Sequence, residues 1–166
     1  MSDRVAELVA RERRSSKHQR MKLAQVAVLS VALAAAADLG TGIAAATPNP
    51  GDSPKVAIAR AYIDALLTHD ASNVPFAPGA TRIEAGMQTG TSGPQLTQDL
   101  DHGVQYSVIQ NIHDIRMSED GDVVTSRYLL DSGVAGVKLV TVDITETFVI
   151  HDGQIQSIVA TIVPTS

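Results

Sequence analysis

The spacing of hydrophobic residues changes near the middle of this chain. In residues 54–69 they recur every three or four positions, which is typical of an amphipathic helix. Either Asp52 or Ser53 can cap this segment, and Pro54 suits the first turn of a helix because an N–H there would have no partner within the helix. The pattern therefore predicts a helix from Pro54 to His69.

Residues 71–93 lack a regular pattern. They contain two prolines and four glycines, which interrupt helices and strands. We interpret this stretch as turns and loops with one short extended piece at 81–85, in which Arg82 and Glu84 form a surface ion pair. A short second helix is predicted over residues 94–101.

From residue 104 onward, hydrophobic and polar residues alternate in long runs rich in β-branched side chains. The alternation predicts four strands, at 105–117, 123–131, 138–150 and 155–163. Asp120-Gly121 and Asp152-Gly153 are typical of two-residue hairpin turns, and residues 132–136 form a looser connection. Helices followed by an antiparallel meander predict an α+β fold.

The turn at Asp152-Gly153 sets an expected register. A two-residue loop there places Ile150 opposite Ile155 and Glu146 opposite Val159. Glu146 is then the one charged residue in a row of hydrophobic side chains on its face of the strand.

The turn at Asp120-Gly121 sets the register of the preceding hairpin. It places His113 opposite Tyr128, with Asn111 on the same face. We expect the pocket of the domain where these polar groups gather.

Three residues are candidates for acid–base catalysis. Apolar surroundings would raise the pKa of Glu146, which suits a carboxyl group to proton transfer near neutral pH. His113 beside Tyr128 could orient a ligand hydroxyl or transfer a proton. The alternatives are structural: Glu146 pairs with a basic side chain or reaches the rim, and His113 and Tyr128 form a hydrogen bond inside the core.

The candidate ligand-binding residues are Tyr62, Asn111 and Phe148. Tyr62 lies on the hydrophobic stripe of the first helix, and the other two lie on the expected strands. Core packing is the alternative role for Tyr62. The expected register also pairs Asp114 with Arg127 on the opposite face, which we interpret as a structural ion pair.

The sequence contains no motif for a bound metal or nucleotide. His69-Asp70 and the Asp99–His102 segment have neither zinc-site nor EF-hand spacing. There is no P-loop, no dinucleotide fingerprint and no G-x-S-x-G nucleophile elbow. We expect no metal and no cofactor.

The first third of the chain has the parts of a secretory signal peptide. A basic segment precedes the apolar run 23–37, and alanines occupy positions 44–46. We therefore predict a signal peptide over 1–46, a linker over 47–53 and a secreted or extracytoplasmic domain. An uncleaved anchor is the alternative, and it would be the protein's one contact with the membrane. Translation can begin at Met1 or at Met21.

The residues after 46 carry six basic and fourteen acidic side chains, a formal charge of −8. A domain of this sign has no electrostatic attraction for the phosphates of nucleic acids, which we exclude as partners. The chain has no cysteine, so its stability depends on packing and hydrogen bonds rather than on disulfides.

The chain resembles small secreted bacterial proteins of the nuclear transport factor 2-like superfamily, also called SnoaL-like or cystatin-like. The matching stretches are RAYIDALLTHD (60–70), VPFAPGATR (74–82), SRYLLDSG (126–133) and TETFVIHDGQI (145–155). The resemblance implies N-terminal helices packed on a curved antiparallel sheet of four or more strands, enclosing a cone-shaped pocket. That superfamily includes steroid isomerases, epoxide hydrolases, polyketide cyclases and non-catalytic binding modules, and none of their catalytic sets matches here residue by residue.

We expect the domain, residues 54–166, to bind a small apolar or lipid-like molecule between its first helix and the sheet. One alternative is a cofactor-independent lyase, isomerase or hydrolase. Another is a homodimeric interaction module, whose outer sheet face would carry Thr145, Thr147 and Ile158.

Overall fold

The structure, a computed structural model, describes residues 51–165. The predicted signal peptide (1–46) and most of the predicted linker (47–53) lie outside these residues. Within the described part, no helix is both long enough and apolar enough to cross a membrane.

Helix α2 spans Pro54–Thr68, which confirms the first predicted helix. The Ser53 side chain caps it by accepting a hydrogen bond from the backbone N–H of Val56. The helix ends at His69, which adopts the left-handed conformation and donates its backbone N–H to the carbonyl of Ala65. A second helix, α3 (Gly93–His102), is followed by the 3-10 turn η1 (Val104–Tyr106).

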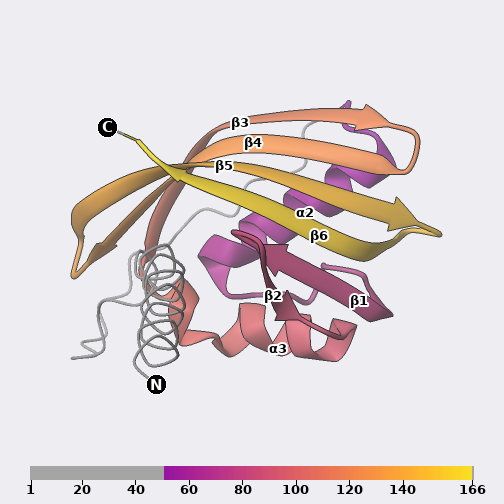
Figure 1. Cartoon of the computed structure of the whole chain (residues 1–166), viewed down its shortest axis with the longest axis horizontal. Helices are drawn as coiled ribbons and strands as arrows, with labels where there is room; N and C mark the ends of the chain where they lie inside the picture. Colours follow the sequence, from indigo (N-terminus) through magenta and orange to yellow (C-terminus); the bar gives the residue numbers. More distant parts are fainter. Residues whose placement is uncertain (1–50, 166) are drawn as a thin grey trace, which may run out of the picture. The chain divides into compact units, whose positions relative to one another are not determined.

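The two helices pack on one six-stranded sheet (Figure 1). The strand order is β2-β1-β6-β5-β4-β3. The strands are β1 (Phe76–Glu84), β2 (Met87–Gly90), β3 (Ile109–Asp120), β4 (Val123–Val134), β5 (Val137–His151) and β6 (Gln154–Pro164). The α+β class is confirmed, but the sheet is mixed and not wholly antiparallel, because β1 runs parallel to β6.

The interpretation of 71–93 as mostly loops is wrong. This stretch holds β1 and β2, joined by a tight turn at Ala85-Gly86. Pro78 and Gly79 are tolerated within β1 because the pairing of β1 with β6 is interrupted between Phe76 and Thr81. Because proline and glycine are unfavourable inside strands, the sequence provides no indication of a strand as long as β1.

The β3–β4 register differs from the prediction. The turn is Gly121-Asp122 instead of Asp120-Gly121, and the ladder shifts again between His113 and Arg116, around Asp114 with its positive φ of 56°. His113 therefore lies opposite Leu129 and not opposite Tyr128.

The predicted ion pair between Asp114 and Arg127 is also wrong. Arg127 binds Asp143 on the neighbouring strand β5, with 3.0 Å between Arg127 Nε and Asp143 Oδ1. Both residues lie on the outer part of the sheet, meaning the face turned away from the core, where Arg127 is exposed.

The β5–β6 turn at Asp152-Gly153 and the Ile150–Ile155 pair are confirmed. Beyond this pair, one extra residue in β6 shifts the register, so that Glu146 faces Ala160 and not Val159. The same shift turns Ile158 into the core, where it is buried, and it is not part of the outer face.

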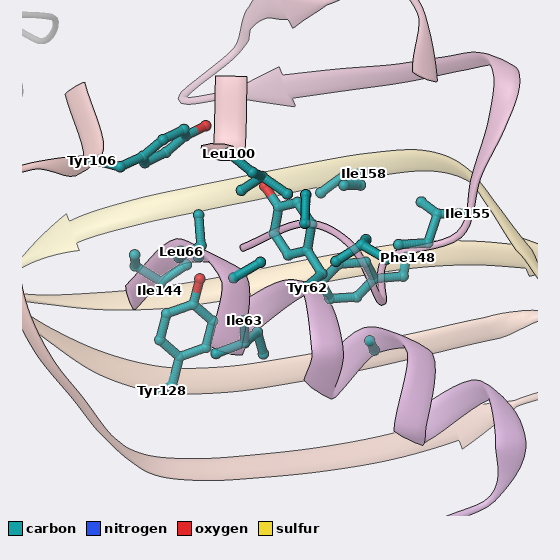
Figure 2. Packing of buried hydrophobic residues seen from close by; sticks show 14 of the residues in the cluster. Tyr62, Ile63, Leu66, Leu100, Tyr106, Tyr128, Ile144, Phe148, Ile155 and Ile158 are labelled. Carbon is teal, nitrogen blue, oxygen red and sulfur yellow. The ribbon is translucent and has the colours of Figure 1, made fainter. Parts of the chain in front are cut away.

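The main core lies between α2 and the sheet and is built mostly of aliphatic side chains. Its aromatic residues include Tyr62 of α2, which packs edge-on against Phe76 and Phe148 with ring centroids 6.2 and 5.3 Å apart. Figure 2 shows the phenol groups of Tyr62, Tyr106 and Tyr128 among the aliphatic residues of this core.

Gly93→Ala tests the contact between α3 and β1. A Cβ at Gly93 would collide with the backbone carbonyl oxygen of Ala77 and would lie 3.0 Å from Phe76 Cβ. We expect the substitution to lower the free energy of unfolding by about 1–3 kcal/mol, measured by urea denaturation.

Gly79→Ala is the matched control, because a Cβ there meets open space. It should leave stability unchanged or raise it by about 0.5 kcal/mol, since alanine restricts the unfolded chain. Equal effects of the two substitutions would contradict the packing described for α3.

Candidate functional site

Glu146 lies in the middle of the inner face of the sheet and is only 2% exposed. Its cross-strand neighbours are Ser126 on β4 and Ala160 on β6, and Ala160 in turn pairs with Glu84 on β1. Ser126 and Ala160 are both small. The carboxyl group of Glu146 is therefore accessible to larger side chains, such as Tyr128, that are not directly opposite it.

The hydroxyl of Tyr128 donates a hydrogen bond to Glu146 Oε2 across 2.9 Å. Burial raises the pKa of Glu146 to about 8, and the charge of Glu84 adds to the increase. The hydrogen bond from Tyr128, the charge of Arg82 and the nearby hydroxyl of Tyr62 act in the opposite direction. Glu146 is therefore mostly protonated and uncharged at neutral pH.

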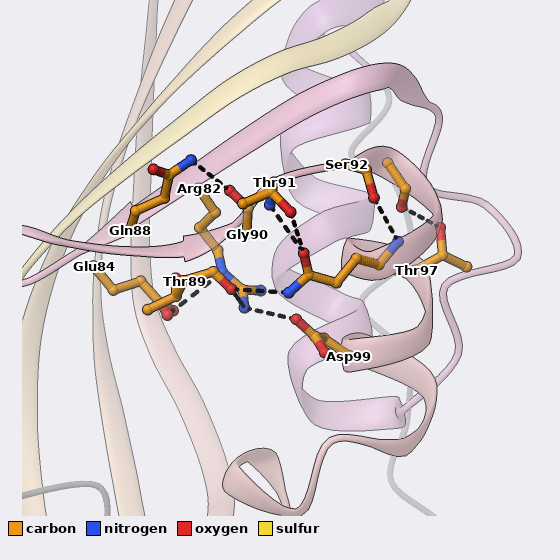
Figure 3. A network of polar contacts seen from close by, with 11 residues as sticks. Arg82, Glu84, Gln88, Thr89, Gly90, Thr91, Ser92, Thr97 and Asp99 are labelled. Carbon is orange, nitrogen blue, oxygen red and sulfur yellow. Dashed lines mark hydrogen bonds and ion pairs between the residues drawn. The ribbon is translucent and has the colours of Figure 1, made fainter.

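Arg82 lies on the inner face of β1, is 1% exposed, and is near enough to Glu146 for its positive charge to lower the pKa of that carboxyl group. Figure 3 shows how its guanidinium group is held. Nε donates to Thr89 Oγ1 over 3.0 Å, and Nη2 donates to the Thr89 carbonyl oxygen over 3.4 Å and to Asp99 Oδ2 over 3.2 Å. The carboxylate of Glu84 lies 3.4 Å from Nε, and the guanidinium carbon lies 5.7 Å from the centroid of the Tyr106 ring.

Tyr62 and Tyr106 contribute two further buried hydroxyl groups. Burial is the main cause that raises the pKa of each phenol, and the nearby charges of Glu146 and Glu84, respectively, raise it further. Both phenols stay protonated at neutral pH and can donate hydrogen bonds.

We call Tyr62, Arg82, Tyr106, Tyr128 and Glu146 the buried polar cluster. In residues 51–165, the buried side-chain atoms without a hydrogen-bond partner are Tyr62 Oη, Arg82 Nη1 and Tyr106 Oη. All three belong to the cluster. Each such atom costs about 1–3 kcal/mol when it is left unpaired, so their concentration here calls for a partner that residues 51–165 do not supply, either water or a bound molecule.

The structure brings some of the predicted site residues together. Glu146, Tyr128 and Tyr62 meet in the cluster, and Phe148 packs against Tyr62 in the adjoining core. Whether these residues bind a ligand or catalyse a reaction stays a prediction.

His113 and Asn111 lie away from the cluster. His113 is 37% exposed in its side chain and contacts Asp114 at 3.2 Å and Asp131 at 3.5 Å, while Asn111 is exposed. The changed turn would by itself place His113 opposite Leu130, and the shift around Asp114 then moves it opposite Leu129, which puts it on the other face of the sheet.

Sequence reasoning missed Arg82 and Tyr106 as members of the site. The ion pair of Arg82 with Glu84 exists, but it is not on the surface: Arg82 is buried and also binds Asp99 and Thr89. The alternation of Ala80, Arg82 and Glu84 places the three residues on one face of an extended segment, but two charged residues on that face gave no indication that it is buried. No signal in the sequence marks Tyr106 either.

In the described part of the chain, no group of three or more His, Asp or Glu side chains is arranged to hold a metal ion.

Comparison with known proteins gives one family and several similar structures. Residues 52–162 match the family described as a domain of unknown function, DUF8021. No curated protein sequence matches the chain significantly.

The chain is similar to the solved structure of an M. tuberculosis LEH-like epoxide hydrolase, with a TM-score of 0.57, 16% identity and coverage of 66% of this chain and 82% of that one. The chain is also similar to a Bacillus cereus protein assigned as a polyketide cyclase, with a TM-score of 0.53 and 16% identity. The match covers 66% of this chain and 74% of that one. A third similar structure is that of a Catenulispora acidiphila protein with a ketosteroid isomerase-like fold, with a TM-score of 0.50 and 17% identity. The match covers 62% of this chain and 82% of that one. These likenesses show the nuclear transport factor 2-like fold and, at such identities, the fold alone.

Glu146→Gln tests the uncharged state of Glu146 through stability. A group whose pKa rises from 4.5 in the unfolded chain to about 8 in the folded protein stabilises the fold fully below pH 4.5 and loses that contribution as pH rises through 8. The variant cannot ionise. We expect its stability relative to the wild type to rise by up to about 1.4 kcal/mol for each pH unit over this range, measured by urea denaturation.

The groups that face Glu146 are Tyr128 from β4, Tyr62 from α2, and Arg82 and Glu84 from β1. Asp143→Asn on the same strand is the control, because Arg127 lowers the pKa of Asp143, which stays ionised above pH 5. Its stability relative to the wild type should stay constant between pH 5 and 9. A pH-independent difference for Glu146→Gln as well would contradict the account.

Proposed function

This chain belongs to the DUF8021 family, and we propose that its domain binds a small, largely apolar molecule whose polar group lies at the buried polar cluster. The observation that carries the proposal is the meeting of Glu146 with three unpartnered polar atoms inside an otherwise apolar core. A bound molecule that supplies the missing hydrogen bonds would offset their cost.

The surroundings of the cluster favour an apolar body for this molecule. The hydroxyl-bearing residues Tyr62, Tyr106 and Tyr128 belong to the same core cluster as Leu66 and Leu100 (Figure 2). An apolar molecule in contact with such side chains gains from the removal of its surface from water, while the few polar groups fix its orientation.

Acid–base catalysis by Glu146 is the second candidate function. A pKa of about 8 leaves both protonation states accessible near neutral pH, which is the condition for efficient proton transfer. Tyr128 can hold the ionised state, because its hydroxyl donates to the carboxyl group. Two of the similar structures are described as an epoxide hydrolase and a polyketide cyclase, so this fold accommodates chemistry on small molecules.

Export to the extracytoplasmic space remains part of the proposal. It rests on the basic segment, the apolar run and the alanines of the first 46 residues.

Tyr62→Phe tests the binding proposal, because it removes only the unpartnered hydroxyl. We expect this variant to raise the free energy of unfolding by about 1 kcal/mol, since a buried orphan group disappears. Its affinity for cyclohexane derivatives that each carry one polar group should fall about tenfold, as measured by NMR titration of the full chain.

Arg127→Gln, on the outer part of the sheet, is the control and should leave these affinities unchanged. Wild-type affinity of Tyr62→Phe for every derivative that binds would count against a role for the cluster in binding.

The catalytic candidate is tested by deuterium exchange of cyclohexanone in D₂O. The carboxylate form of Glu146 takes a proton from the carbon next to the carbonyl group, the electron pair moves to the carbonyl oxygen, and a deuteron from solvent then replaces the proton. We expect the wild type to exceed the solvent rate by about 100-fold, with a rate that rises through pH 8. Glu146→Gln should bind cyclohexanone without exchange. Equal exchange by both proteins would leave binding as the function.

A further inference from the structure

The unpartnered atoms of the buried polar cluster restrict the chemistry of its ligand. Arg82 Nη1 can only donate a hydrogen bond, whereas the hydroxyl groups of Tyr62 and Tyr106 can donate or accept. A ligand that satisfies all three must therefore offer at least one acceptor to Arg82. An ammonium group has no acceptor and cannot fill this role.

The charges around Arg82 restrict the ligand further. Two carboxylates, those of Asp99 and Glu84, already lie 3.2 and 3.4 Å from its guanidinium nitrogens, and their side chains are 26% and 25% exposed. The single positive charge is thus matched before any ligand arrives. A carboxylate on the ligand would bring a further negative charge into the interior without a partner, which is strongly unfavourable.

The other members of the cluster supply no compensating positive charge. Tyr62, Tyr106 and Tyr128 are neutral phenols whose pKa burial raises, and Glu146 is mostly uncharged at neutral pH because burial raises its pKa to about 8. A neutral oxygen acceptor is the ligand group that uses the free donors and adds no charge.

We infer that the ligand is an uncharged molecule with an exposed oxygen acceptor, such as a ketone, ester or cyclic ether, and that this oxygen binds Arg82 Nη1 beside Tyr62 and Tyr106. The inference rests on the proposed function, which it narrows to one class of ligand. Asp99 and Glu84 act as positioning and charge-selecting residues, because they orient the guanidinium group and match its charge.

Three probes with one carbon skeleton test this inference: cyclohexanone, cyclohexanecarboxylate and cyclohexylammonium. Each is titrated into the isotope-labelled full chain at pH 7 and constant ionic strength, and its dissociation constant is taken from shifts of the Tyr62, Arg82 and Tyr106 signals. We expect cyclohexanone to bind at least about tenfold more tightly than either charged probe.

Asp99→Asn should change this selectivity. The variant keeps the size of the side chain and removes one of the two negative charges beside Arg82, so the ratio of the carboxylate to the ketone affinity should rise about tenfold or more. An amide spectrum close to that of the wild type is the check that this variant is folded. Asp143→Asn removes a negative charge that pairs with Arg127 on the outer part of the sheet, and it should leave the ratio unchanged.

The outcomes separate the inference from the proposed function. If a charged probe binds at the cluster more tightly than cyclohexanone, the inference is wrong and the binding proposal stands. If the ketone is preferred and Asp99→Asn has no effect, Asp99 does not select charge. If no probe shifts the signals of the cluster, both the inference and the proposed function are wrong.

Discussion

The cost of removing polar groups from water governs the interior of this domain. A core without cysteine or tryptophan, built mainly from Val, Ile, Leu and Ala, encloses Arg82 and Glu146 at 1% and 2% exposure. Arg82 keeps its charge because Asp99, Glu84 and Thr89 surround it. Glu146 has no such partner of opposite charge in direct contact and instead takes up a proton, with the pKa of its carboxyl group raised to about 8. Both the stability and the proposed chemistry of the domain depend on this difference.

Two local shifts of strand register decide which side chains enter the polar cluster. The extra residue of β6 places the small Ala160 opposite Glu146, and Ser126 flanks it on the other side. This arrangement leaves room for the Tyr128 hydroxyl to reach the carboxyl group from a diagonal position. The shift around Asp114 has the opposite effect, because it moves His113 to the partly exposed side of the sheet.

The sequence predicted the elements in which hydrophobic residues recur at a regular spacing. The spacing of hydrophobic residues located α2 nearly to its last residue, and alternation located β4, β5 and β6 within three residues at each end. It did not locate β1 and β2, since Pro78 and Gly79 lie at an interruption of the ladder that only the paired strand reveals. Glu146 could be found as a lone charge in an apolar row. Arg82 could not, because its burial depends on Asp99 from a helix 17 residues further along the chain.

The most direct measurement of the central claim is the pKa of Glu146. The side-chain carboxyl carbons of a ¹³C-labelled protein report each titration by NMR, and the signal that is missing in Glu146→Gln identifies this residue. The account predicts a midpoint near 8, several pH units above an exposed glutamate. A midpoint near 4.5 would show that the carboxylate is ionised and solvated at neutral pH, which would contradict both the uncharged site and the role proposed for it.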